Sequence, residues 1–347
     1  MGHGLRVPDD IEVWHRWQER RHPLRHARNR VRQLGPTAPL VFDLSWGGSD
    51  ADICVVVDAG HASVAAALNE PLALLPPERV VLVQPHGLPV HHGFRVSSTP
   101  QPVAESELAR TLRGVTTVLG SGHYTQAGAA VWAALPSART FVSQHGAVTP
   151  YAPPLPSTTT VLAWTQADAD FWRSGRRGIG AEVVGSQLLW RAGAVNSPDH
   201  VGSPAGSLTF LGQGHATEIS RARLTHAVLN TCREHGAVYR PHPSERDIAS
   251  RAVLKAYARA GIAVDTSGVP LVDLQAPIVS VFSTGVLEAA ARGRDAWVDF
   301  PRPPAWLGEF WERYDMHRLG SSPTPAPPLT AQEPAQRIAE IVTAAAS

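Results

Sequence analysis

Short apolar runs alternate with longer, partly polar segments from about residue 40 onward. Runs rich in Val, Ile, Leu and Phe are typical of buried strands. In the first half of the chain they are Leu40–Leu44, Ile53–Val57, Val80–Val83, Thr116–Leu119, Thr140–Val142, Val161–Trp164 and Ala181–Gly185. Helix-like segments lie between several of them, such as Ala62–Leu68, Ser106–Leu112 and Thr125–Leu135. This alternation predicts an α/β fold with a parallel, doubly wound sheet.

The same pattern starts again after a change in composition. Residues 196–206 are rich in Pro, Gly, Ser and Asn and indicate a linker. New apolar runs follow at Ser207–Leu211, Gly236–Tyr239 and Pro277–Phe282. The length of 347 residues suits two domains better than one. The predicted parts are a domain over 1–195, the linker 196–206, a domain over 207–330 and a closing helix over 331–347.

Two predicted strands of the second half end in polar turns. One runs into Arg240-Pro241-His242-Pro243, and the other into Ser283-Thr284-Gly285. We call these the HP turn and the serine turn. Ligands of open parallel α/β sheets bind at the carboxyl ends of the strands. The sequence therefore predicts a binding site formed by both turns.

The residues after the serine turn favour a helix, since Val286–Arg292 is rich in Ala with one Leu and one Glu. Ser283 or Thr284 can cap that helix. A helix amino terminus presents free N–H groups and partial positive charge, which suits a phosphate. Arg240 and His242 can donate to the same anion, and Glu288 can accept from ribose hydroxyls. Each turn alone is also compatible with a purely structural role.

The pair of turns resembles the HP and serine-rich motifs of the bacterial polysialyltransferase, capsule-polysaccharide and CDP-glycerol glycerophosphotransferase group. The resemblance implies the GT-B fold, in which two Rossmann-like domains with parallel sheets face a cleft and a C-terminal helix crosses back to the first domain. It also implies that His242, Ser283 and Thr284 hold the phosphate of a nucleotide-activated donor. The resemblance covers the second half well and the first half only loosely.

Turns rich in Gly and His follow three predicted strands of the first half, at Asp58–His61, Gly120–His123 and Gln144–Gly146. Gln144-His145-Gly146 resembles the His-Gly turn of the teichoic-acid polymerase relatives, which implies that His145 is a catalytic base. A histidine suits that role because its ordinary pKa is about 6.5. Asp58 is the alternative base. His61 and His123 are candidate acceptor contacts or ordinary loop residues.

A Gly-rich turn, Gly212-Gln213-Gly214, follows the first predicted strand of the second domain. Gly212 and Gly214 would let the backbone approach a diphosphate. The full Gly-x-Gly-x-x-Gly fingerprint of dinucleotide-binding proteins is absent from this turn, which disfavours a nicotinamide-dependent dehydrogenase.

Composition excludes several other classes. The net charge of +1 argues against a nucleic-acid-binding protein. The two cysteines, Cys54 and Cys232, form neither a disulfide framework nor a zinc motif and fit a reducing cytoplasm. No apolar run is long enough to span a bilayer, and residues 1–10 lack the apolar core of a signal peptide. We expect no cofactor and no metal.

Residues 11–33 predict a basic leading helix with Trp14 and Trp17. Two interpretations remain open. The segment can rest on an anionic membrane surface from the cytoplasmic side, or its tryptophans can pack on the domain. Pro23 interrupts the segment and favours packing.

The resemblance therefore implies a metal-independent transferase, and the composition fits the cytoplasm. Such a transferase would move a glycosyl or polyol-phosphate unit from a nucleotide sugar or CDP-polyol to a hydroxyl of a capsule-type or cell-envelope glycan, or of a small acceptor. One alternative is a nucleotide-sugar 2-epimerase, which the Ser-x-Gly-x-x-Glu region resembles. Another is a non-catalytic scaffold that binds a nucleotide sugar or a partner enzyme.

Overall fold

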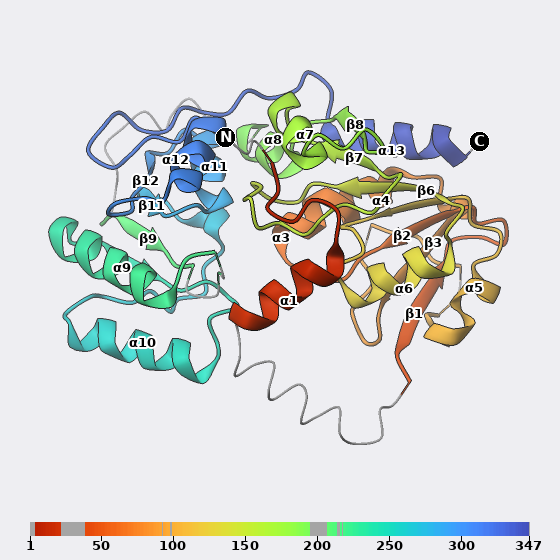
Figure 1. Ribbon diagram of the computed structural model, residues 1–347, viewed down its shortest axis with the longest axis horizontal. Helices are drawn as coiled ribbons and strands as arrows, with labels where there is room; N and C mark the ends of the chain where they lie inside the picture. The colour runs from red at the N-terminus through yellow and green to blue at the C-terminus, as the bar shows by residue number, and fades with distance from the viewer. Residues whose placement is uncertain are drawn as a thin grey trace. The chain divides into compact units, whose positions relative to one another are not determined.

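A computed structural model describes residues 4–21, 39–91, 93–97, 99–194, 207–213, 216 and 218–346. The chain divides into two compact units (Figure 1). The first unit comprises Met1–Leu188 with Thr330–Ser347, and the second comprises Leu189–Leu329. The predicted linker 196–206 lies outside the described residues.

The first unit is built on an eight-stranded sheet with the order β4-β1-β3-β2-β5-β6-β7-β8 among its described residues. The strands are β1 (Val41–Trp46), β2 (Ile53–Val56), β3 (Val80–Pro85), β4 (Gln101–Ala104), β5 (Thr117–Gly120), β6 (Arg139–Ser143), β7 (Thr160–Ala163) and β8 (Gly180–Val183). From β3 to β8 all neighbours are parallel, as predicted. The sequence did not indicate β4, nor that β1 runs antiparallel to both β3 and β4.

Helices surround this sheet. They are α1 (Ile11–Arg21), α3 (Ala62–Val64), α4 (Glu70–Leu74), α5 (Leu108–Thr111), α6 (Gln126–Ala134), α7 (Gln166–Arg173) and α13 (Pro334–Ala346), with α8 (Gln187–Ala194) at the junction of the units. Shorter turns are the π-helical η1 (Ala65–Asn69) and the 3-10 turns η2 (Pro77–Arg79) and η3 (Glu105–Glu107). Of the predicted helix Ala62–Leu68, the second half is thus a π-helical turn.

The alternation of side chains along β2 explains how both faces of the sheet are buried. Ile53 and Val55 belong to an apolar cluster with α4, η1 and Ile338 of α13. Cys54 and Val56 belong to a cluster with α5 and α6 on the other face. The C-terminal helix α13, dark blue in Figure 1, thereby completes the core of the first unit.

The leading helix α1 is held by its tryptophans. Trp14 is buried, and its indole Nε1 donates to the carbonyl oxygen of Tyr151 at 2.8 Å. The ring of Trp17 stacks on that of Tyr151 with centroids 5.0 Å apart. Both described tryptophans of α1 therefore pack on the domain. Residues 22–33 of the predicted basic helix lie outside the described residues, and membrane contact stays a prediction. None of the described helices is long and apolar enough to cross a bilayer.

The second unit contains a parallel four-stranded sheet with the order β10-β9-β11-β12 among its described residues. Its strands are β9 (Thr209–Leu211), β10 (Val238–Arg240), β11 (Ile278–Ser280) and β12 (Ala296–Val298). Its helices are α9 (Arg221–His235), α10 (Ile248–Arg259), α11 (Thr284–Ala291) and α12 (Ala305–Arg313), with the 3-10 turn η5 (Leu271–Asp273). Single parallel bridges join Val264 to Tyr239 and Arg318 to Val298. The unit is Rossmann-like, with strands and helices in alternation.

Candidate functional site

Three turns of the second unit meet at one edge of its sheet. β9 lies between β10 and β11, and all three strands are parallel. The residues after them, Gly212, His242 and Ser283, therefore lie along the same carboxyl edge. This arrangement brings the predicted HP and serine turns to either side of the Gly212 turn.

His242 is an exposed residue of the HP turn with a defined ring orientation. The backbone N–H of Ser244 donates to His242 Nδ1 at 3.1 Å. Nδ1 is thus the acceptor nitrogen, and the neutral ring carries its proton on Nε2. His242 can therefore donate a hydrogen bond from Nε2 in its neutral form.

Glu245, which the sequence reasoning missed, stabilises the HP turn through hydrogen bonds of its carboxylate. Its side chain is almost buried. Glu245 Oε1 accepts from the backbone N–H of His242 at 3.1 Å, and Oε2 accepts from the hydroxyl of Tyr239 at 2.8 Å. Burial and the nearby Glu245 carboxylate raise the pKa of Tyr239. An acidic residue two positions after the second proline of the turn was the only sequence signal.

Gly212 occupies a position where only a glycine fits. A Cβ at Gly212 would lie 2.3 Å from the hydroxyl oxygen of Tyr239 and 2.7 Å from Glu245 Oε1. Its backbone N–H donates to the carbonyl oxygen of Arg240 at 2.7 Å. The close packing against Tyr239 and Glu245 thus explains why a glycine is needed at position 212, whether or not a ligand binds. Gly214, the other predicted glycine, lies outside the described residues.

The serine turn begins a helix where the sequence predicts one. Ser283 is the N-cap of α11, and its Oγ accepts from the backbone N–H of Gly285 at 3.1 Å. Thr284 is the first residue of the helix. A Cβ at Gly285 would lie 2.7 Å from Leu211 Cδ1, so this glycine lets the helix amino terminus approach the end of β9.

Arg240 and Glu288 lie in the same unit with partners of their own. Arg240 forms an ion pair with Asp265 at 2.8 Å and also donates to the carbonyl oxygen of Val269. Its guanidinium thus ties the end of β10 to the following loop. Glu288, in the second turn of α11, pairs with Arg292 at 3.4 Å. Burial raises the pKa of Glu288, and the positive charge of Arg292 opposes that effect.

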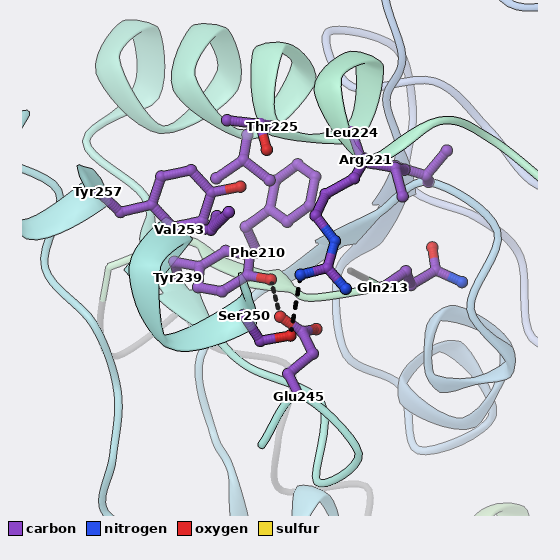
Figure 2. A pocket seen from close by; sticks show the side chains of 12 residues that line it. Phe210, Gln213, Arg221, Leu224, Thr225, Tyr239, Glu245, Ser250, Val253 and Tyr257 are labelled. Carbon is purple, nitrogen blue, oxygen red and sulfur yellow. Dashed lines mark hydrogen bonds between the residues drawn. The ribbon is translucent and has the colours of Figure 1, made fainter. Parts of the chain in front are cut away.

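A narrow pocket with about 10 Å³ of enclosed space lies between α9, α10 and the sheet (Figure 2). Aromatic and aliphatic side chains line it, including Phe210, Tyr239 and Tyr257. In Figure 2 the guanidinium of Arg221 reaches Ser250, with Nη1 donating to Oγ at 3.3 Å. Tyr239, which also lines the pocket, supports the HP turn through its hydrogen bond to Glu245.

His145 and His61 come together at the carboxyl edge of the first unit's sheet. The His145 ring is hydrogen-bonded to the backbone of Ser143. Burial, with the adjacent charge of His61, lowers the pKa of His145 to about 4. The imidazole is therefore neutral at pH 7 and has one ring nitrogen free of the Ser143 bond to accept a proton. His61 keeps an exposed surface, yet desolvation lowers its pKa as well.

A small pocket adjoins His145, at the ends of β6, β7 and β8. It is lined by the π-helical turn η1, Trp164, Ser186 and α13. The His145 turn itself is held by the buried Gln144, whose Nε2 donates to Asp168 Oδ2 at 3.1 Å. Its enclosed space is only about 10 Å³, room for about one water molecule beside His145.

Asp58 and His123 occupy different surroundings in the first unit. Asp58 Oδ2 accepts from the hydroxyl of Thr125 at 2.7 Å, and Oδ1 accepts from the backbone N–H of Ala127 at 3.2 Å. The carboxylate thus anchors the start of α6, and burial raises its pKa. His123 Nδ1 is buried and has no hydrogen-bond partner among the described residues. Burial also lowers the pKa of His123.

No cluster of three or more His, Cys, Asp or Glu side chains suited to a metal ion occurs in the described part of the chain. Neither a protein-family model nor any curated protein matches the sequence.

Solved structures do match the fold. UDP-GlcNAc 2-epimerase of Methanocaldococcus jannaschii, solved with UDP-GlcNAc and UDP, has a TM-score of 0.50 and 13% identity; the match covers 84% of this chain and 99% of that one. HepE of Anabaena, solved with UDP-glucose, has a TM-score of 0.49 and 12% identity over 84% and 88% of the two chains. A glycosyltransferase of Rickettsia africae has a TM-score of 0.45 and 11% identity over 86% and 93%.

Identities this low establish the fold and nothing more. The predicted fold class is confirmed: the chain is a GT-B protein with two Rossmann-like domains. Its C-terminal helix packs on the first unit, as that fold predicts.

Proposed function

We propose that this protein transfers a glycosyl unit from a nucleoside-diphosphate sugar to a hydroxyl acceptor. The observation that carries the proposal is the row of turns after the adjacent strands β10, β9 and β11. Two of these turns offer hydrogen-bond donors suited to an anion: His242 Nε2 and the amino terminus of α11 at Ser283. Between them, the Gly212 turn brings backbone close to the same edge.

The chemistry of these donors fits a diphosphate leaving group. Transfer of the sugar leaves additional negative charge on the diphosphate, and fixed donors around it lower the barrier. Little reorganisation is needed, because Ser244 already orients the His242 ring and the Ser283 cap fixes the start of α11. Glu288, in the second turn of α11, is the proposed acceptor for ribose hydroxyls.

His145 is the proposed base that takes the proton from the acceptor hydroxyl. Its lowered pKa keeps it neutral at physiological pH, so the proton-accepting form predominates. Asp58 is the alternative, although both its oxygens accept hydrogen bonds at the start of α6. The surface around His145 is the proposed place for the accepting sugar. A capsule-type or cell-envelope glycan, as in the polysialyltransferase group, is the proposed acceptor class.

Calorimetric titration with UDP, GDP, CDP and CMP tests the donor site, with CDP-glycerol included for the polyol-phosphate alternative. We expect one nucleoside diphosphate to bind more tightly than its own nucleoside by at least about tenfold, because the site is built for phosphate. If the protein binds none of these nucleotides, the proposal fails. A turnover assay with sugar derivatives of the preferred nucleotide then identifies the donor.

The second candidate is a nucleotide-sugar 2-epimerase. The sequence resembles the Ser-x-Gly-x-x-Glu region of such epimerases at Ser283, Gly285 and Glu288. These three residues lie at the N-cap and in the first two turns of α11. Proton NMR of UDP-GlcNAc with the protein and no acceptor separates the two functions. Conversion to the 2-epimer supports the epimerase, whereas transfer that requires an added acceptor supports the transferase. Binding with neither reaction supports a scaffold.

A further inference from the structure

The side chain of Gln213 lies between the HP turn and the serine turn. Gln213 follows Gly212 at the end of β9, and only 9% of its surface is exposed. Its Oε1 accepts from the backbone N–H of Phe282 at 2.8 Å and from the hydroxyl of Ser280 at 3.2 Å. Phe282 directly precedes the Ser283 cap, so the amide group lies beside the amino terminus of α11.

These contacts fix which end of the amide faces outward. A backbone N–H can only donate, so the atom opposite Phe282 must be the amide oxygen and the remaining atom must be Nε2. No described residue accepts a hydrogen bond from Nε2. Figure 2 shows the Gln213 amide directed away from Arg221 and Tyr239. The donor of a side chain that is only 9% exposed is thus held in place with no partner among the described residues, and it can bind a ligand.

We propose that Gln213 is a donor-binding residue whose Nε2 donates to a diphosphate oxygen of the nucleotide sugar. This inference rests on the proposed function and adds a third contact to that site, between His242 and the start of α11. The geometry favours phosphate over ribose or base for two reasons. Nε2 can only donate, which matches phosphate oxygens. It also lies at the α11 amino terminus, where the helix favours negative charge.

The test uses the isosteric substitution Gln213→Glu in the full-length protein. The new carboxylate keeps an acceptor for the Phe282 N–H and places an acidic oxygen where Nε2 was. We expect the affinity for UDP to fall by roughly tenfold or more, because a charged hydrogen bond becomes a repulsion. The affinity for uridine, which has no phosphate, should change by less than about threefold, measured by NMR titration. If the protein prefers another nucleoside diphosphate, that nucleotide and its nucleoside replace UDP and uridine in this test.

Gln275→Glu is the matched control. Gln275 is an exposed glutamine of the same unit. It precedes β11 and therefore lies at the opposite edge of the sheet, so Gln275→Glu adds the same negative charge away from the proposed site. We expect wild-type affinity for both ligands. If Gln213→Glu does not fold, Gln213→Met provides an uncharged replacement of similar length, and a loss of UDP affinity of at least about threefold with uridine affinity unchanged is expected.

The outcomes separate this inference from the proposed function. Loss of affinity for UDP but not for uridine supports the contact. Equal losses for UDP and uridine, or no loss for either, overturn it and leave Gln213 as a structural link between β9 and the serine turn. If the wild-type protein binds no nucleotide, the proposed function itself fails.

Discussion

At the scale of single residues, the predicted role of His242 depends on one hydrogen bond from the backbone. The Ser244 N–H donates to Nδ1, so the neutral ring carries its proton on Nε2. His242→Ala should therefore lower kcat/KM by at least about tenfold, the range for loss of a charged hydrogen bond. The melting temperature should stay near that of the wild type, because the residue is exposed.

Ser244→Ala is the control for that change, since it keeps the backbone N–H that orients the ring. It should retain full activity and donor affinity. Full activity in His242→Ala would contradict the assignment. A large drop in the melting temperature of His242→Ala would instead indicate that the HP turn is structural.

His145 gives a prediction about pH. Its pKa is about 4 in the folded protein, below the ordinary histidine value of about 6.5. Between these two values the unfolded chain binds a proton that the folded chain does not, so stability falls as the pH is lowered through this window. The loss amounts to at most about 3 kcal/mol. His145→Gln should reduce this decline when urea unfolding is compared at about pH 7 and about pH 4.5.

The same lowered pKa predicts a rate profile. If His145 is the base, kcat/KM should stay level from neutral pH down to about pH 5 and fall only as the pH approaches 4. His145→Gln should slow turnover at saturating donor, and Asp58→Asn should leave it nearly unchanged. The reverse result would assign the base to Asp58. If both variants keep full turnover, the base lies elsewhere, with His61 and His123 as the next candidates.

At the scale of elements, the start of α11 combines a helix cap with a proposed phosphate site. The double change Ser283→Ala with Thr284→Val removes both hydroxyls. Donor affinity should fall by about one to two powers of ten, given about 1.5–3 kcal/mol for each hydrogen bond to a charged phosphate. Calorimetry well below the melting temperature measures this effect.

Thr165→Ala provides the comparison. Thr165 caps α7 in the first unit, where its hydroxyl accepts from the backbone N–H of Asp168 at 3.1 Å. Its loss should cost about 1 kcal/mol of stability and leave donor affinity intact. If the Ser283 and Thr284 variant behaves in the same way, those residues only start a helix.

The Gly212 turn predicts a difference between two glycines. Gly212→Ala would push a Cβ against Tyr239 and Glu245, so it should lower stability by about 1–3 kcal/mol and weaken donor binding. Gly308 lies inside α12, where an added Cβ would meet no atom within 4 Å, so Gly308→Ala should be stabilising by about 0.5–1 kcal/mol. Thermal melts of both variants test the difference. An unchanged melting temperature in Gly212→Ala would show that Tyr239 and Glu245 can shift away from the added Cβ.

The elements that the sequence predicted correctly are those with strong local patterns. Apolar runs located β2, β3 and β5 within a few residues, and Ser283 marked the start of α11. β4 was missed because an edge strand with exposed Gln101 and Pro102 has no apolar run. The antiparallel direction of β1 depends on its neighbours in the sheet, which no local pattern encodes. For the same reason Glu245 and Gln213 went unrecognised, since their roles arise from contacts with Tyr239 and Phe282.

At the scale of the whole molecule, the chain builds two cores from segments that are not consecutive. α13 follows the second unit in sequence but belongs to the first, where Ile338, Ala339 and Val342 join the cluster around β2. The turns after β10, β9 and β11, which form the proposed nucleotide site, lie entirely within the second unit. Stability of the first unit and nucleotide affinity of the second should therefore respond to different substitutions.

Ile338→Ala tests this separation. The Ile338 side chain is only 2% exposed, and truncating a side chain buried to this extent costs about 2–5 kcal/mol. Calorimetric melting should show the first unit unfolding at a lower temperature, while affinity for the nucleotide well below that transition stays at the wild-type value. Arg337→Ala, an exposed change one position earlier on α13, should alter neither quantity. Saturating nucleotide should stabilise only the second unit. At a concentration about a hundred times the dissociation constant, it should raise the free energy of unfolding of that unit by about 2.7 kcal/mol. A loss of nucleotide affinity in Ile338→Ala would mean that the donor site depends on the first unit's core, contrary to its placement.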